Sequence, residues 1–230
     1  MKRFSCFLML VLAAAWLNAC TCQRQKEQPS ATNQTLMEPL YDINTTMGTI
    51  RIKLYAGTPR HRQNFEELAA QGFYDGILFH RVINGFMIQS GDPLTKDPAN
   101  AEQFGTGGPG YTVPAEIVAD YHHVKGALAA ARKGDFVNPS KASSGSQFYL
   151  VQDENNCIHL DGEYTVFGQA VEGLDVIDKI AAQETDMRDC PLEPVRILSV
   201  VKVMAEESKA ATDSTATADS TAAKDSIGKF

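Results

Sequence analysis

The sequence predicts a mainly β fold, either a closed or a sandwiched sheet, covered by two helices. Many short segments in the middle of the chain alternate apolar with polar residues, a period that is typical of strands with one buried face. Only two segments, residues 58–71 and 174–182, space their apolar residues as a helix does. Both ends of the 230-residue chain look unlike folded protein, which leaves a middle part of ordinary single-domain size.

The N-terminus has the layout of a secretory signal, in which Lys2 and Arg3 precede an apolar run over residues 4–17. This run is shorter than the roughly 20 residues that a membrane span needs. Removal of residues 1–19 takes away two positive charges, so Lys plus Arg falls from 21 to 19 against 28 acidic residues, and the net charge moves from −7 to −9. A chain with this negative charge is unsuited to neutralising the phosphates of a nucleic acid, and we expect no nucleic-acid partner.

Residues 17–20, Leu-Asn-Ala-Cys, resemble a bacterial lipobox. We therefore expect residues 1–19 to be a lipoprotein signal peptide and Cys20 to be the lipidated first residue of the mature protein. An uncleaved anchor and an ordinary secreted protein are the alternatives. Thr21, rather than an aspartate, follows the cysteine and resembles the pattern for transport to the outer membrane, with the protein on its periplasmic or surface side.

Two segments of biased composition flank the predicted domain. Residues 20–40 are polar and lack aromatic residues, which predicts a flexible tether between the lipid on Cys20 and the domain. Residues 206–230 consist mainly of Ala, Thr, Ser, Asp and Lys, which predicts a disordered low-complexity tail. The folded domain is expected over residues 41–205.

The domain begins with a predicted hairpin followed by a helix. On either side of a turn at residues 46–48, the alternating apolar positions are Ile43, Ile50, Ile52 and Leu54. We expect Thr58 to cap the N-terminus of the helix, Pro59 to occupy its first turn and Gly72 to stop it. The apolar stripe of this helix is formed by Phe65, Leu68 and Ala69.

Residues 79–92 read as two short strands joined at Asn84-Gly85, a dipeptide that adopts positive φ at low cost. Arg81 and Gln89 are the polar exceptions in this apolar stretch. Period-2 alternation puts Gln89 on the same face as Met87, which suggests a partly apolar groove with two polar groups. A half-exposed hairpin whose Arg and Gln are simply solvated is the alternative.

The remaining elements are shorter. Residues 104–110 are rich in glycine, but no buried strand precedes them and no Lys-Ser or Lys-Thr follows, so they are interpreted as a structural turn. The small residues of 126–131 let another backbone or a ligand approach closely. Strands are predicted over residues 124–131, 147–151, 164–168 and 195–203, with a loop over residues 132–146.

Several kinds of chemistry lack support. The five histidines show no metal-ligand spacing, and the adjacent pair His122-His123 is expected to be solvated. No Gly-x-Ser-x-Gly elbow occurs, which argues against a serine hydrolase, and no cofactor motif is present. The cell envelope would permit a disulfide between Cys157 and Cys190, but isolated thiols fit the sequence equally well.

An ordered series of motifs resembles the cyclophilins, the peptidyl-prolyl cis-trans isomerases. The matching segments are residues 79–83 (Phe-His-Arg-Val-Ile), 85–92 (Gly-Phe-Met-Ile-Gln-Ser-Gly-Asp), 126–131, 145–149, 160–162 and 166–168. The resemblance extends over roughly residues 41–205, the whole predicted domain. The resemblance implies a closed eight-stranded antiparallel β-barrel capped by two α-helices, and the isomerisation of X-Pro bonds without a cofactor or metal.

Isomerisation needs a catalyst that favours the twisted amide over both planar forms. On twisting, the prolyl nitrogen gains a basic lone pair, and a guanidinium is a donor that stays charged. We predict that Arg81 donates to this nitrogen and that Gln89 holds the peptide main chain beside it. A preorganised donor can contribute about 2.7–4 kcal/mol to transition-state stabilisation, a hundredfold or more in rate.

The resemblance assigns further residues to substrate binding. The predicted proline pocket consists of Phe86, Met87, Tyr149 and Leu160, and the backbone of Ala131 is expected to bind the peptide main chain. Strict alternation puts Phe86 opposite Met87, so both reach one pocket only if the backbone at Gly85 departs from regular strand geometry.

Some positions differ from the best-studied cyclophilins. His159 replaces a Trp and Tyr164 replaces a His, and both are included in the predicted substrate site. Arg132 replaces an Asn ahead of a longer loop, and Tyr149 replaces the more usual Phe. Because the family's binding of the drug cyclosporin depends on that Trp, we expect weak inhibition by cyclosporin.

The sequence therefore predicts a lipid-anchored monomeric isomerase that acts on proline-containing segments of exported proteins. The main alternative is a chaperone module that binds proline-containing peptides with little turnover. A third reading is a domain that only presents its tether and tail to an envelope partner.

Overall fold

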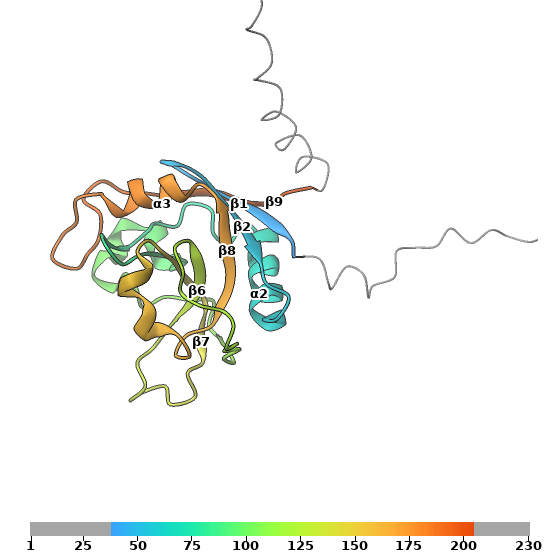
Figure 1. Ribbon diagram of the computed structural model, residues 1–230. Coiled ribbons are helices and arrows are strands. Elements are labelled where there is room, and N and C mark those ends of the chain that lie inside the picture. The colour runs from blue at the N-terminus through green and yellow to red at the C-terminus, as the bar shows by residue number, and fades with distance from the viewer. Residues whose placement is uncertain (1–37, 205–230) are drawn as a thin grey trace, which may run out of the picture.

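The computed structural model describes residues 38–204, in which eight antiparallel strands form one curled sheet in the order β3-β4-β7-β6-β8-β2-β1-β9 (Figure 1). The predicted signal peptide, the lipidation site Cys20, most of the tether and the tail lie outside the described residues. A further short strand, β5, pairs with β7. The strands are β1 (Leu40–Thr45), β2 (Gly48–Leu54), β3 (Arg81–Ile83), β4 (Met87–Ser90), β5 (Thr112–Val113), β6 (Ala127–Arg132), β7 (Ser143–Val151), β8 (Val166–Glu172) and β9 (Ile197–Lys202).

The sheet is a curled half-barrel, so the prediction of a closed barrel is wrong. The regular ladder stops at β3 on one edge and β9 on the other. The two edges are joined only by an isolated bridge between Leu78 and Arg196 and by a few backbone hydrogen bonds. One of these is the bond from the amide of Phe79 to the carbonyl of Val195 at 2.9 Å. Because β3 is three residues long and the amide of Val82 donates to a loop residue instead of a strand, the edge offers too little backbone for a ladder.

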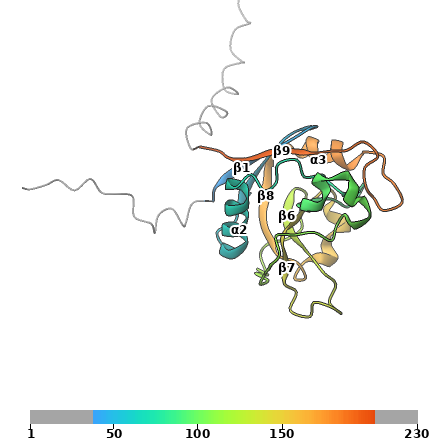
Figure 2. The ribbon, with the colours of Figure 1, turned by 180° about the vertical axis from the view of Figure 1, so that it is seen from behind.

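Two α-helices pack against the sheet, as predicted. Helix α2 (Pro59–Ala70) and helix α3 (Leu174–Ala181) lie well apart in both views (Figures 1 and 2). Four 3₁₀ helices complete the described elements: η1 (Pro93–Lys96), η2 (Pro98–Gln103), η3 (Glu154–Asn156) and η4 (Ile158–Leu160).

The start of α2 is correct in the prediction, but its cap is not. Thr58 occupies the N-cap position without a capping hydrogen bond from its side chain. The carboxylate of Glu116 accepts the backbone N–H groups of Arg60 (3.1 Å) and His61 (2.9 Å) instead. An anion at this position satisfies free N–H groups and opposes the helix dipole. A cap that comes from a distant loop leaves no local signal in the sequence.

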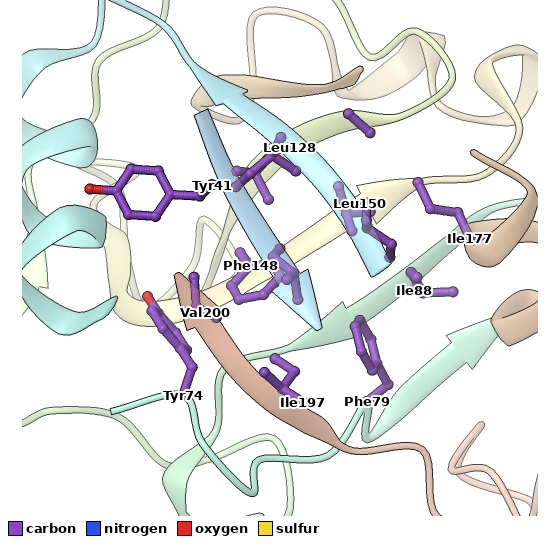
Figure 3. Packing of buried hydrophobic residues seen from close by; sticks show 14 of the residues in the cluster. Tyr41, Tyr74, Phe79, Ile88, Leu128, Phe148, Leu150, Ile177, Ile197 and Val200 are labelled. Atoms are coloured by element: carbon purple, nitrogen blue, oxygen red, sulfur yellow. The ribbon is translucent and has the colours of Figure 1, made fainter. Parts of the chain in front are cut away.

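The inner core fills the concave side of the half-barrel. Its buried apolar residues come from the strands, from both helices and from the segment between α2 and β3, which supplies Tyr74 and Phe79 (Figure 3). Ten of its members are labelled in Figure 3: Tyr41, Tyr74, Phe79, Ile88, Leu128, Phe148, Leu150, Ile177, Ile197 and Val200.

A second apolar cluster lies on the opposite face of the same strands. Strand β7 serves both clusters, because Phe148 and Leu150 belong to the inner core while Tyr149 and Val151 point the other way. This outer cluster consists of Met87, Ala127, Ala129, Tyr149, Val151, Cys157, Leu160 and Val166.

Several boundaries differ from the predicted ones. Strand β7 begins at Ser143, inside the predicted loop, and β5 has no counterpart in the sequence prediction. Of the two alternatives for the cysteines, the structure has free thiols, with Cys157 buried and Cys190 partly exposed.

The glycine-rich stretch is a turn that wraps a carboxylate. The buried side chain of Asp92 accepts the backbone N–H groups of Leu94 (2.8 Å), Gly105 (2.6 Å) and Gly107 (3.1 Å). A Cβ at Gly107 would lie 2.0 Å from an Asp92 oxygen, so only glycine fits there.

Candidate active site

A pocket of about 120 Å³ opens above the outer cluster. Its walls are supplied by strands β3, β4, β6 and β7, by the turn between β3 and β4, and by η4 with the segment that follows it. All the predicted site residues of the domain except His159 line it, together with Arg132. The lining residues are Arg81, Phe86, Met87, Gln89, Ala131, Arg132, Tyr149, Leu160 and Tyr164.

Phe86 and Met87 reach the same pocket because the backbone turns just before β4. Gly85 has φ of 77°, and the amide of Phe86 donates to Ile83 O at 3.0 Å, so Phe86 belongs to the turn and not to the alternating strand. The segment after β7 fixes this turn, since Gln152 Oε1 accepts the Gly85 amide at 2.8 Å. The departure from strand geometry that the prediction required is therefore present.

His159 supports the pocket from outside. Its exposed ring stacks on the ring of Phe86, with centroids 6.1 Å apart and planes inclined by 17°. The structure therefore places His159 behind a pocket residue and not in the pocket wall.

Arg81 lies at the edge of the pocket on β3, with its side chain 43% exposed. Its Nε is 3.8 Å from Oδ2 of Asp189, a residue of the loop between α3 and β9. The carbonyl of Asp189 accepts the amide of Val82 at 2.7 Å, which fixes this loop beside β3. Asp186 stabilises the loop further, because its carboxylate accepts the amides of Arg188 and Cys190.

Gln89 is held by a chain of amide hydrogen bonds. Its Nε2 donates to Oε1 of Gln147 at 2.9 Å, and Nε2 of Gln147 donates to the carbonyls of Gly105 (3.0 Å) and Gly107 (2.8 Å). The glycine-rich turn thus orients a pocket residue through one intermediate side chain. This arrangement leaves the Oε1 atom of Gln89 as an acceptor for a ligand.

A buried histidine fixes the pocket residue Tyr149. The side chain of His123 is fully buried, which contradicts the expectation that it is solvated. Its Nδ1 lies 2.6 Å from Asp161 Oδ1 and its Nε2 lies 2.9 Å from the Tyr149 hydroxyl. With Nδ1–H donated to the carboxylate, the neutral imidazole accepts the phenol hydrogen at Nε2. No local pattern indicates this role, since nothing in the surrounding residues distinguishes His123 from its exposed neighbour His122.

Burial and hydrogen bonding set the protonation states in this chain. Burial lowers the pKa of His123, although Asp161 acts against this shift. Partial burial alone would raise the pKa of Asp161, but the hydrogen bonds from His123 and His122 hold it below its usual value. Burial also raises the pKa of Tyr149 well above 10.0, so its hydroxyl keeps its proton.

The guanidinium of Arg132 has a structural role in the pocket wall. Its side chain is only 4% exposed, and its guanidinium lies 4.4 Å from the ring centroid of Tyr164. It donates to the carbonyls of Glu163 and Lys133 and pairs with the carboxylates of Asp135 and Glu163. Of the two pocket arginines, Arg81 is therefore the one that is accessible to a ligand.

A second carboxylate–imidazole–hydroxyl chain lies beside α2. His61 contacts Glu116 through Nδ1 (2.7 Å) and the hydroxyl of Ser143 through Nε2 (2.9 Å). The group types match those of a serine hydrolase, but Ser143 is only 1% exposed, so no substrate reaches its oxygen. Burial lowers the pKa of His61, which remains a neutral structural link between α2 and β7.

Among residues 38–204, no three or more His, Cys, Asp or Glu side chains are placed to hold a metal ion. No helix of this part of the chain has both the length and the apolar character needed to cross a bilayer.

The family model for cyclophilin-type peptidyl-prolyl cis-trans isomerases matches residues 40–202, nearly all of the described domain. The chain belongs to the cyclophilin family. A peptidyl-prolyl cis-trans isomerase of Schizosaccharomyces pombe is 38% identical to this cyclophilin over 162 residues, which cover 70% of this chain and 96% of that protein. One from Helicobacter pylori is 40% identical over 142 residues, which cover 60% and 77% of the two chains.

The fold is similar to that of solved cyclophilins. A crystal structure of a Cryptosporidium parvum cyclophilin superposes with a TM-score of 0.64 at 27% identity and covers 73% of this chain and 99% of its own. The same parasite protein was also crystallised in the presence of the dipeptide Ala-Pro, with a TM-score of 0.62. This cyclophilin is therefore an enzyme of the peptidyl-prolyl cis-trans isomerase class.

Proposed function

We propose that this cyclophilin accelerates rotation about X-Pro bonds by donation from the Arg81 guanidinium to the prolyl nitrogen of the twisted amide. The observation that carries the proposal is the position of Arg81, an accessible cation at the edge of an apolar pocket of about 120 Å³. Twisting removes the amide conjugation that creates a barrier of about 18–20 kcal/mol, and it moves no proton. A fixed donor is therefore sufficient chemistry, and no nucleophile or general base is needed.

The pocket residues would hold the proline while the preceding carbonyl rotates. Phe86, Met87 and Leu160 offer apolar contacts to the ring, and Tyr149 offers its ring because its hydroxyl is already bonded to His123. Gln89 and the backbone at Ala131, where the register of β6 shifts against β7, would bind the peptide main chain. The relative crystallised in the presence of Ala-Pro supports a proline-containing ligand.

Asp189 is the positioning residue of this mechanism. Its carboxylate attracts Arg81 in the free enzyme, which restricts the rotamers of a long and partly exposed side chain. At 3.8 Å the two groups form an ion pair without a short hydrogen bond, so the guanidinium N–H groups remain available to the substrate.

The experiment is an isomerisation assay on a short X-Pro peptide. We expect Arg81→Ala to lower kcat/KM by a hundredfold or more, since a preorganised donor contributes about 2.7–4 kcal/mol. Arg60→Ala, which removes an exposed arginine of α2, serves as the charge-matched control and should keep the wild-type rate. Full activity in Arg81→Ala would eliminate the mechanism. A wild-type protein that binds the peptide without turnover would support the alternative, a chaperone module.

We also propose that the enzyme is a lipoprotein of the cell envelope that acts on exported proteins as a monomer. This proposal rests on the sequence of residues 1–40, with the basic start, the apolar run and the Leu-Asn-Ala-Cys motif that ends at Cys20. Uncatalysed proline isomerisation takes about 10–100 s and limits the folding of exported chains. Mass spectrometry of the mature protein should find a diacylglycerol on Cys20 as the first residue. A free N-terminus at another position would contradict the lipid anchor.

A further inference from the structure

The loop that joins β6 to β7, residues 133–142, presents two apolar side chains to solvent beside the pocket. Phe136 is 100% exposed and Val137 is 68% exposed. The loop projects from the body of the domain in both views, below β7 (Figures 1 and 2). Because Phe136 buries none of its surface against the rest of residues 38–204, its position brings no packing energy to the fold.

The loop has a defined conformation that displays these side chains. Asn138 closes it, because its Nδ2 donates to the carbonyl of Ala142 at 2.9 Å while its Oδ1 accepts the amide of Ala142 at 3.1 Å. The amides of Val137 and Asn138 both donate to the carbonyl of Gly134 at 3.1 Å. A fixed loop holds an exposed aromatic side chain ready for a ligand at a low cost in conformational entropy.

Arg132 attaches the loop to the pocket. This arginine lines the pocket, and the same guanidinium pairs with Asp135 and donates to the carbonyl of Lys133 at 3.1 Å. On the other side of the loop, Lys141 pairs with Glu163 at 2.6 Å. Phe136 follows Asp135 directly and is four residues from Arg132, so its Cα lies within about 14 Å of that of Arg132. An extended peptide bound in the pocket covers this distance with about four residues.

We propose that the loop extends the substrate groove, and that Phe136 and Val137 bind an apolar side chain of the same polypeptide within about four residues of the proline. This inference rests on the proposed function and adds a preference for apolar segments around the proline. Unfolded chains expose such segments, whereas folded proteins bury them.

The size of the surface favours a transient peptide over other occupants. A stable dimer buries about 800 Å² on each partner, whereas one aromatic side chain contributes about 150–250 Å². A membrane surface is recognised by clusters of basic residues, but in this loop Asp135 accompanies the two lysines and Lys141 is paired with Glu163. A single apolar side chain of a client matches what the two residues offer.

The test compares peptides of about 15 residues with one proline in a polar sequence. A leucine is moved through the four positions on either side of the proline, and each peptide is compared with its serine counterpart. We expect the wild-type enzyme to prefer leucine at the best position by about tenfold in kcat/KM, as burial of one apolar side chain implies. The double substitution Phe136→Ser/Val137→Ser should bring this ratio close to one.

Leu198→Ser is the matched control, because it removes an exposed leucine of β9, whose side chain is 57% exposed. It should keep the wild-type ratio. A wild-type enzyme with equal rates on leucine and serine peptides, or a double variant that keeps the preference, would overturn the proposal. If the wild-type protein turns over neither peptide, the proposed function fails, and the same leucine-to-serine ratio is then measured as binding by fluorescence anisotropy. Equal binding of both peptides would also overturn the role of the loop.

Discussion

The inner core and the outer cluster share strands but differ in chemistry. On β7, Phe148 and Leu150 pack into the inner core among aromatic and aliphatic side chains, and neither side chain has a polar atom. Their neighbour Tyr149 faces the outer cluster, where its hydroxyl depends on His123 and its ring borders a pocket. The period of two along one strand thus separates a face that stabilises the fold by packing from a face that holds a cavity by hydrogen bonds.

In the inner core, the loss of one aromatic ring should destabilise the fold strongly. Phe148 is 1% exposed and contacts the rings of Phe65 and Tyr74 edge to face. Phe148→Ala should lower the free energy of unfolding by about 3–5 kcal/mol, because it leaves a cavity in a packed core. Urea denaturation followed by circular dichroism measures this change. A loss below about 1 kcal/mol would show that the inner core adapts and would remove the contrast.

The outer side should respond to the loss of one hydrogen bond. Tyr149→Phe keeps the ring in the pocket but leaves Nε2 of His123 buried without its partner, so we expect a loss of about 1–3 kcal/mol in the free energy of unfolding. His122→Gln is the matched control, since His122 contacts the other oxygen of Asp161 from an exposed position, and it should change stability by less than about 0.5 kcal/mol. Equal stability of Tyr149→Phe and wild type would argue against the hydrogen bond.

A smaller change tests the turn that brings Phe86 into the pocket. Gly85 has φ of 77°, and a Cβ there would meet only Asn156 Nδ2 at 3.8 Å, so alanine fits in space but is strained by about 1–2 kcal/mol. Gly85→Ala should therefore raise KM for an X-Pro peptide about threefold to tenfold as the turn relaxes. Gly108→Ala, at a glycine without positive φ, should leave KM unchanged. A higher KM for Gly108→Ala than for Gly85→Ala would contradict this role of Gly85.

Both regions contain a buried neutral histidine, so acid should weaken them together. The pKa values of His61 and His123 are lowered from 6.5, so between the folded value and 6.5 the unfolded chain binds more protons than the folded one. The free energy of unfolding should fall as the pH decreases below about 6.5. The lowered pKa values of Glu116 and Asp161 add a further loss below 4.5 and 3.8.

Urea denaturation between pH 8 and pH 4 measures this dependence. His61→Gln and His123→Gln should each reduce the slope, because each removes one buried imidazole whose pKa is lowered in the folded chain. A stability that stays constant from pH 8 to pH 5 would show that neither His61 nor His123 has a lowered pKa in the folded chain.

Local patterns predicted most of the elements, whereas the pocket residues were predicted from the resemblance to the cyclophilins. The Asn84-Gly85 turn, the start of α2 and the small residues of β6 all follow from rules that act over a few residues. The contributions of Glu116, His123 and Asp189 could not be predicted, because each acts on a residue far away in the sequence. The same reason explains the error about closure, since the edge of β3 is occupied by a loop more than 100 residues further along the chain.

The pairing of β1 with β9 has a mechanical consequence. The described chain enters and leaves through neighbouring strands, with Tyr41 opposite Lys202 and the amide of Val203 bonded to the carbonyl of Leu40 at 2.9 Å. A force that pulls these two ends apart acts across the ladder and opens it in the unzipping direction, one hydrogen-bonded pair at a time. Strands β2 and β8 lie between β1 and the pocket strand β6, so the first strand pair to open under such a force is separated from the pocket by two strands.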